Sequence, residues 1–197
     1  MIERSDIRDR AVRAMLPLAA REGWNQGTLR AGLAAIGEDP ALAPSHFPRG
    51  AVGAVLAWFD LVNRETEAAA AAEGVAGLRV PARIRRVVEL RLAALAPHKQ
   101  ALRRAASLLA LPWNAGCAAA AAGAAADSLW HAAGDVSADF SWYTRRATLA
   151  AIYAATIAWW LRDDDPGLAG ALQFLDRRLA GLARLQGLGR RGRPRAA

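Results

Sequence analysis

The chain has 197 residues, 54% of them hydrophobic, and Cys117 is its single cysteine. A chain of this length buries about 70% of its unfolded surface, so a core is expected without disulfides or structural zinc. The opening residues MIERSDIRDR alternate charges where a secretory signal needs an apolar run, which predicts a cytoplasmic protein.

The net charge of +8 is distributed unevenly along the chain. Residues 1–60 hold seven arginines against seven acids, whereas residues 79–104 hold eight bases against Glu89 alone. A nucleic-acid binder places positive charge on the element that meets phosphate, so this distribution argues against the N-terminal region as a DNA-binding surface. Anionic lipid headgroups are the other target that basic regions of this kind attract.

Residues 1–67 are predicted to form a small head that resembles a helix-turn-helix unit. Pro17 is expected to bend or break the first helix, Thr28 to cap the second, and Gly37 to close it. The expected helices are residues 5–21, 28–36 and 51–67. The would-be recognition segment contains Glu38, Asp39, Pro40 and Pro44, which favours a structural head over a DNA reader.

Residues 68–188 are predicted to form a helical body that follows a small-residue linker over 68–77. Apolar residues at three-to-four spacing indicate an amphipathic helix from residue 80 to Pro97, and a further helix is expected over 100–111. Arg83, Arg86 and Arg91 are expected to point toward water. They form either a solvated face or a surface for a partner or headgroup.

The segment from residue 114 to His131 is rich in alanine, and almost pure alanine over 115–126, and is therefore predicted to be helical. Small side chains let neighbouring helices approach closely, or they leave a cavity when bulky helices face them. The pattern leaves both outcomes open.

Aromatic and charged residues are concentrated between Ala126 and Ala154. Gly134 is expected to break the chain there, Ser137 to cap the next helix, and Asp139 to favour its dipole. That helix contains the apolar segment 147–161, which at 1.5 Å per residue reaches about 22 Å against a hydrocarbon core of about 30 Å. A central buried helix is therefore favoured over a membrane span.

Asp127, His131 and Asp135 recur at four-residue spacing, which is compatible with a metal site. Because Gly134 is expected to end the helix before Asp135, a hydrogen-bonded capping network is the favoured alternative, and we predict no metal site. Nucleophile–base motifs, a P-loop and a dinucleotide fingerprint are all missing from the sequence. We therefore expect no catalytic residues, no cofactor and no enzyme activity.

The last helix is predicted to begin at Asp165-Pro166 and to carry a leucine stripe from Leu168 to Leu185. Such a stripe faces the chain's own core or a second subunit. The residues 189–197 that follow are basic and are predicted to be a disordered tail attracted to anionic surfaces.

Four motifs in this order and at this spacing carry a family resemblance: VPARIR, LALPWN, DSLWHAAGD and DFSWYTRRATLAAIY. They resemble the lipid-binding accessory family of ubiquinone biosynthesis, the ninth protein of that pathway in the usual numbering. The resemblance covers roughly residues 5–182 and is strongest over 80–153. It implies an all-α fold like that of TetR regulators, a homodimer, and a hydrophobic pocket for isoprenoid lipids.

The resemblance also implies a function. Such a protein binds a polyprenylated quinone precursor, or a phospholipid, and presents the precursor to the di-iron demethoxyubiquinone hydroxylase. The expected location is the cytoplasm, peripherally on the inner membrane of a bacterium. Long-tailed family members contact the membrane with a terminal amphipathic helix, a role that falls here to the last helix or the arginine tail.

Two sets of site residues follow from this hypothesis. The family's hydroxylase-binding surface falls on Leu129, Asp139, Trp142 and Tyr143. Within the apolar helix, the residues expected to contact lipid are Leu149, Ile152, Tyr153, Ile157 and Trp160. The alternative hypothesis is a TetR-type transcription regulator whose head binds DNA and whose pocket senses a lipid.

Overall fold

The chain folds entirely into helices over the residues that the computed structural model describes, which are 4–134, 141–163 and 167–191, with side chains apart from 141–145 and 182–191. The helices of the head are α1 (Asp6–Glu22), α2 (Gln26–Ala34) and α3 (Ala43–His46). Those of the body are α4 (Gly50–Ala72), α5 (Val80–Leu95), α6 (Lys99–Leu109), α7 (Ala115–Ala132), α8 (Ser141–Arg162) and α9 (Ala169–Arg191). The all-α prediction is confirmed.

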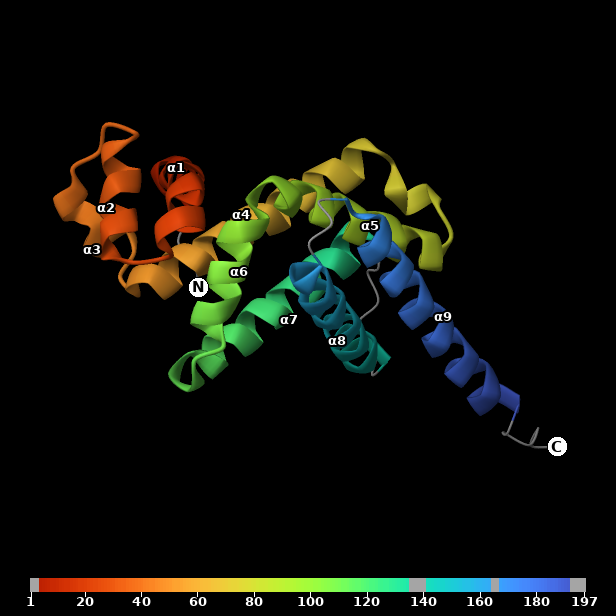
Figure 1. Cartoon of the computed structure of the whole chain (residues 1–197). Coiled ribbons are helices and arrows are strands. Elements are labelled where there is room, and N and C mark those ends of the chain that lie inside the picture. Colours follow the sequence, from red (N-terminus) through yellow and green to blue (C-terminus); the bar gives the residue numbers. More distant parts are fainter. Residues whose placement is uncertain (1–3, 135–140, 164–166, 192–197) are drawn as a thin grey trace.

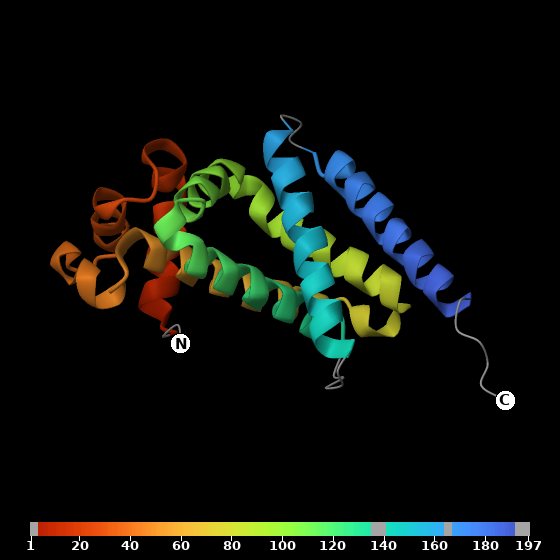
Figure 2. The same cartoon turned by 90° about the horizontal axis from the view of Figure 1, so that it is seen from below.

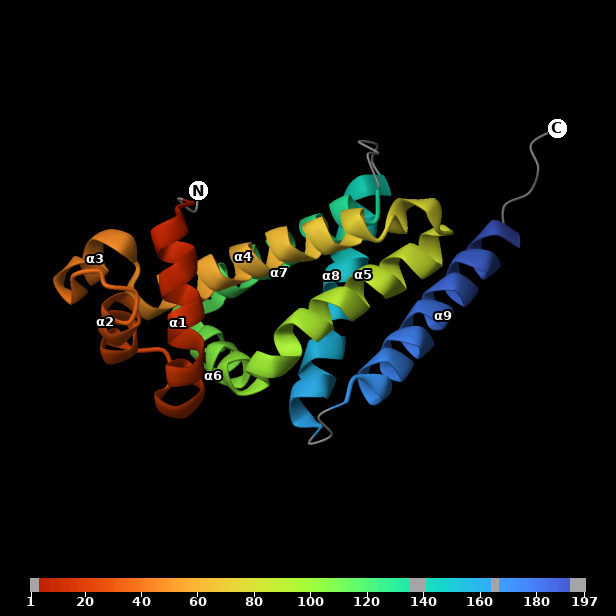
Figure 3. The ribbon, with the colours of Figure 1, turned by 90° about the horizontal axis from the view of Figure 1, so that it is seen from above.

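The head lies at one end of the molecule and α9 at the other, with α4 to α8 between them (Figure 1). Seen from below, α8 lies between α7 and α9 (Figure 2). Seen from above, α4 runs from the head along α7, and α9 lies beside α5 on the outer side (Figure 3). This arrangement leaves α8 with neighbours on only some of its sides.

One local prediction in the head is wrong, and the helix break considered at Pro17 does not occur. The second helix is capped by Asn25, whose side chain accepts a hydrogen bond from the Thr28 amide at 3.0 Å, while the buried Thr28 hydroxyl donates to the Gly23 carbonyl at 2.7 Å. Pro17 lies inside α1 without ending it. Proline removes one backbone donor, but the packed apolar face of α1 holds the helix together across this position.

The helix predicted over 51–67 continues to Ala72, so most of the predicted linker is helical. Alanine has the best helix propensity, and residues 68–72 are all alanine. The chain turns only at Gly74, whose φ of +64° is unfavourable for residues with a Cβ. Similarly, α9 runs to Arg191, so the first three residues of the predicted tail, 189–191, are helical.

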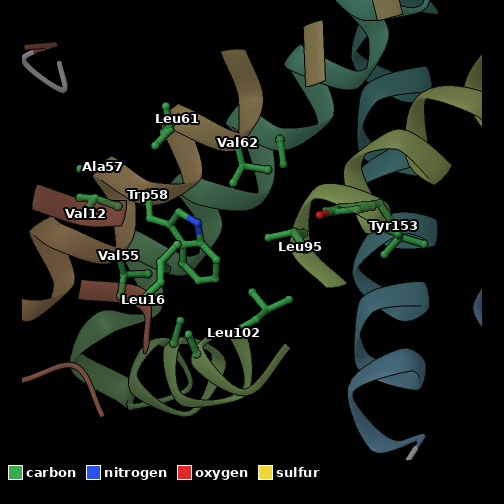
Figure 4. Close-up of a cluster of buried hydrophobic side chains, with 14 of the residues drawn as sticks. Val12, Leu16, Val55, Ala57, Trp58, Leu61, Val62, Leu95, Leu102 and Tyr153 are labelled. Carbon is green, nitrogen blue, oxygen red and sulfur yellow. The ribbon is translucent and has the colours of Figure 1, made fainter. Parts of the chain in front are cut away.

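One hydrophobic core joins the head to the body. Trp58 of α4 is 2% exposed and lies between side chains of α1, α4 and α6 (Figure 4). Trp24, which follows α1, stacks on Trp58 with ring centroids 5.6 Å apart and donates a hydrogen bond to the Ala101 carbonyl of α6 at 3.0 Å. The head is therefore bound to the body through buried aromatic packing.

The helix α8 is not buried on all sides, contrary to the sequence-based expectation. Ala147, Ala151, Ala154 and Ala158 form an exposed row along it. The opposite side is buried through Leu149, Tyr153, Thr156 and Trp160. In the described part of the chain no single helix is long and apolar enough to span a membrane, although the bent pair Val80–Leu109 and Pro112–Ala132 has that length and composition when its halves are taken together.

Candidate functional site

A pocket of about 280 Å³ lies between the helices of the body. This volume is close to the lower limit of small-molecule pockets, which is about 300 Å³. Its lining is Phe59 from α4, Arg91 and Leu95 from α5, Leu102, Ala106 and Leu109 from α6, Ala118, Ala121, Ala122 and Ala125 from α7, and Tyr153, Ala154, Ile157, Ala158 and Leu161 from α8. The alanine-rich α7 therefore borders a cavity, one of the two outcomes that its composition left open.

The pocket is closed where α5 lines it and open where α8 lines it. Leu95 of α5 is 2% exposed and Ala125 of α7 is 4% exposed, so the wall is closed at these two residues. Ala154 and Ala158 of α8 are exposed, and Ala121 and Ala122 are half-buried. A ligand longer than the cavity can therefore extend to the surface along α7 and α8.

Basic side chains of α6 hold the end of α8 in place beside the pocket. Arg103 Nε donates to the Leu161 carbonyl at 2.7 Å, and Lys99 Nζ donates to the Asp163 carbonyl at 2.7 Å. The last carbonyls of a helix lack intrahelical donors and carry partial negative charge, which these cations satisfy. The spacing between α6 and α8, and with it the width of the pocket, depends on these bonds.

Arg91 lines the pocket and is 2% exposed, so the prediction that it faces water is wrong. Its Nε donates to the Tyr153 hydroxyl at 2.6 Å, and its Nη1 donates to Asn63 Oδ1 at 2.6 Å. The sequence does contain a signal for this burial, because Arg91 follows Ile84 and Val88 and precedes Leu95 at the three-to-four spacing of the buried face. An arginine side chain by itself favours an exposed position, but the place of Arg91 on the apolar face of α5 predicts burial, and the residue is buried.

The five predicted lipid-binding residues divide into two groups. Tyr153 and Ile157 line the pocket, and the Tyr153 side chain reaches from α8 toward α5 (Figure 4). Leu149 and Trp160 are 3% and 0% exposed and belong to the core, and Ile152 packs against that core. The rotation of α8 decides which of its apolar residues face the cavity.

The predicted partner-binding residues are described only in part. Leu129 of α7 is 1% exposed and packs in the hydrophobic core of the protein. Asp139 lies outside the described residues, as does Ser137, and Trp142 and Tyr143 lie in the first turn of α8 with their side chains outside the described set. Their assignment to a partner surface stays a prediction.

The three residues considered as metal ligands, Asp127, His131 and Asp135, are described only in part, because Asp135 lies outside the described residues. Asp127 forms an ion pair with Arg146 Nε, which joins α7 to α8. Within the described ranges, no group of three or more His, Cys, Asp or Glu residues is arranged to hold a metal ion.

Comparison with known proteins agrees with the motifs. Residues 116–186 match the COQ9 family model. The chain is 42% identical over 96 residues to the ubiquinone biosynthesis protein COQ9, mitochondrial, of Rattus norvegicus, covering 49% of this chain and 31% of that protein. The Homo sapiens protein of the same name is 42% identical over 96 residues, which cover 49% of this chain and 30% of that protein. The Drosophila melanogaster protein is 38% identical over 99 residues, which cover 50% of this chain and 30% of that protein.

The chain thus covers about a third of the length of the curated relatives that it matches. A TetR transcriptional regulator from Nitrosomonas europaea has the same fold, with a TM-score of 0.72, 22% identity, and 91% of this chain and 99% of that chain covered. Both halves of the predicted resemblance are confirmed: residues 116–186 match the COQ9 family model, and the chain has the fold of a TetR regulator.

Proposed function

We propose that this protein is a lipid-binding accessory factor of ubiquinone biosynthesis, without enzyme activity of its own. It binds a polyprenylated quinone precursor and presents it to the di-iron demethoxyubiquinone hydroxylase. The observation that carries this proposal is the apolar pocket between α4 and α8, which coincides with the COQ9 domain along α7 and α8. Its wall of small side chains suits a flexible hydrocarbon chain.

The proposal is tested by extracting the purified protein with organic solvent and identifying the released lipids by mass spectrometry. We expect isoprenoid quinone precursors or phospholipids in amounts that approach one per protein chain. Recovery of neither lipid class, from protein that was purified without detergent, would contradict a carrier role.

The proposed partner surface is tested separately by pull-down with the hydroxylase. Trp142→Ala and Tyr143→Ala are expected to weaken association, because truncation of an aromatic residue at an interface commonly costs about 2 kcal/mol or more. Trp113→Ala is the matched control, since Trp113 is 77% exposed in the turn between α6 and α7. Association that is unchanged in both test variants, or equally weakened in the control, would refute the assigned surface.

A homodimer at the inner membrane of a bacterium completes the proposal. Ala147 and Ala151, the exposed alanines of α8 that do not line the pocket, support the dimer, because small side chains allow a second helix to approach closely. Analytical ultracentrifugation is expected to give twice the monomer mass. A monomer at micromolar concentration would contradict this part of the proposal alone.

The TetR fold also favours a second candidate, a lipid-responsive transcription regulator. Against it, α3 has only four residues and contains Pro44, where a DNA reader needs a longer, uninterrupted helix in the groove. Salt-dependent retention on duplex DNA that disappears when the head is mutated would favour the regulator.

A further inference from the structure

Arg91 is the main polar feature of a pocket that is otherwise apolar. Of the described residues that line the pocket, only Arg91 and Tyr153 carry polar side-chain atoms. Arginine is always charged in proteins, and burial of a charge is costly unless an opposite charge and hydrogen-bond acceptors compensate it. The partners of this guanidinium therefore indicate what the pocket is built to hold.

The partners of Arg91 are all neutral. Tyr153 and Asn63 each accept one hydrogen bond, and the guanidinium carbon also lies 5.3 Å from the centre of the Tyr153 ring. Guanidinium has five N–H donors, so these two bonds leave most of them available. Over the described ranges of the chain, no carboxylate forms an ion pair with Arg91.

This lack of a carboxylate contrasts with the neighbouring arginines of the same helix. Arg85 pairs with Glu89 and Asp176, and Arg86 pairs with Glu73 and Glu89, although both arginines are more exposed than Arg91. The two carboxylates of Arg86 raise its pKa, chiefly through the hydrogen bond to Glu73. Acids from α5, from α9 and from the end of α4 thus pair with the more exposed arginines, whereas no carboxylate of the described residues pairs with the buried one.

We infer that Arg91, flanked by Asn63 and Tyr153, receives the oxyanion head of an amphiphilic lipid whose tail lies along the alanines of α7 and α8. This inference rests on the proposed function, in that the pocket must hold a lipid at all. A planar guanidinium pairs well with an oxyanion, and such charge-assisted hydrogen bonds are stronger than neutral ones. The ionised phenol of a quinone precursor and the phosphate of a phospholipid are two sources of this chemistry.

The geometry of the pocket supports this orientation of the lipid. Arg91 and Leu95 are sealed from solvent, whereas Ala154 and Ala158 are exposed. A head held at Arg91 is desolvated and protected, and a tail too long for about 280 Å³ continues toward the open side. The oxygen atoms of the head supply the negative charge that Tyr153 and Asn63 do not.

The first experiment compares ligands that share one isoprenoid tail and differ in the head. Farnesyl phosphate, a farnesylated hydroquinone and farnesol are titrated into the lipid-free protein below their critical micelle concentrations, with calorimetry as the readout. We expect at least one oxyanion-forming ligand to bind about tenfold more tightly than farnesol, which corresponds to about 1.4 kcal/mol. Preference for the phosphate identifies a phospholipid-like source, and preference for the hydroquinone identifies a quinone precursor.

Variants then assign the preference to Arg91. Arg91→Met has a similar length and no charge, and we expect it to lose the preference while it still binds farnesol. Arg91→Lys keeps the charge and is expected to keep part of the preference, and it also covers the case in which the methionine variant does not fold. Tyr153→Phe removes only the hydroxyl partner and is expected to retain the preference.

The outcomes separate this inference from the proposed function. Equal affinity of the wild-type protein for all three ligands, or a preference that survives in Arg91→Met, overturns the role of Arg91 and leaves lipid binding intact. Failure of every farnesyl ligand to bind, together with no lipid in the extract, overturns the proposed function itself.

Discussion

His98 is a titratable residue held against the aromatic core. It follows α5, is half-buried, and meets the Trp58 ring edge-on with centroids 6.4 Å apart. Burial lowers the pKa of His98, and the opposing effect of Glu65 is smaller. The folded protein therefore favours the neutral imidazole, so protonation of this side chain opposes folding.

This shift predicts a loss of stability in mild acid. An unfolded histidine takes up its proton near pH 6.5, above the lowered pKa of the folded state, so the unfolded state binds more protons between these two values. The free energy of unfolding should be fully retained above about pH 6.5 and should fall as the pH drops from there toward the folded pKa. Thermal unfolding followed by circular dichroism between pH 8 and pH 5 measures this dependence.

The control for that measurement is His98→Phe, which keeps an aromatic contact with Trp58 and removes the titrating group. The variant should show a flatter pH dependence over the same interval. A wild-type protein and a variant with the same slope would show that other groups cause the loss.

Closely packed helices depend on glycine at one position in the head. A Cβ built on Gly32 of α2 would lie 2.3 Å from Met15 Cγ and 3.1 Å from the Ala11 carbonyl oxygen of α1. Met15 is fully buried, so it has little room to move. The contact between α1 and α2 therefore requires glycine at this point.

We predict that Gly32→Ala destabilises the protein by about 1–3 kcal/mol through overpacking. Gly123→Ala is the matched control, because a methyl group at Gly123 in α7 would meet no heavy atom of another helix within 4 Å. That change should stabilise the protein by about 0.5–1 kcal/mol, since alanine loses less conformational entropy in a helix. Urea titrations give both values, and a neutral Gly32→Ala would show that the α1–α2 contact relaxes easily.

The whole molecule brings five helices around a pocket that none of them forms alone. Phe59, Arg91, Leu102, Ala122 and Tyr153 come from five different helices and meet there. Because the head shares its core with the body through Trp58, disturbance of the head is also expected to reach the pocket. The ability to hold a lipid in this pocket therefore requires the whole fold to be assembled.

Filling the pocket should reduce lipid binding without unfolding the protein. Ala122→Phe places a ring in the cavity from the α7 wall, and we expect it to remove most of the co-purifying lipid while the melting temperature stays near that of the wild type. Ala124→Phe is the control, because Ala124 is exposed on the same helix and does not line the pocket. Equal lipid content in the two variants would contradict the location of the site.

The sequence was sufficient for features that depend on local interactions. Helical periodicity, proline at the start of α5 and glycine after α7 identified the elements, and the spaced motifs indicated the resemblance to the COQ9 family, whose model matches residues 116–186. It was less reliable at helix ends, where Asn25 and Thr28 compete to cap the same helix and only the geometry of the turn decides.

What the tertiary structure alone decided is which side of each helix faces which neighbour. The hydrogen-bond partners of Arg91 are Tyr153 and Asn63, which come from other helices, and Trp160 enters the core while Ile157 faces the cavity because of the rotation of α8. Local sequence determines that a helix forms, since its hydrogen bonds join residues four apart. A pocket depends on contacts between residues far apart in the chain, and only the packed fold fixes these.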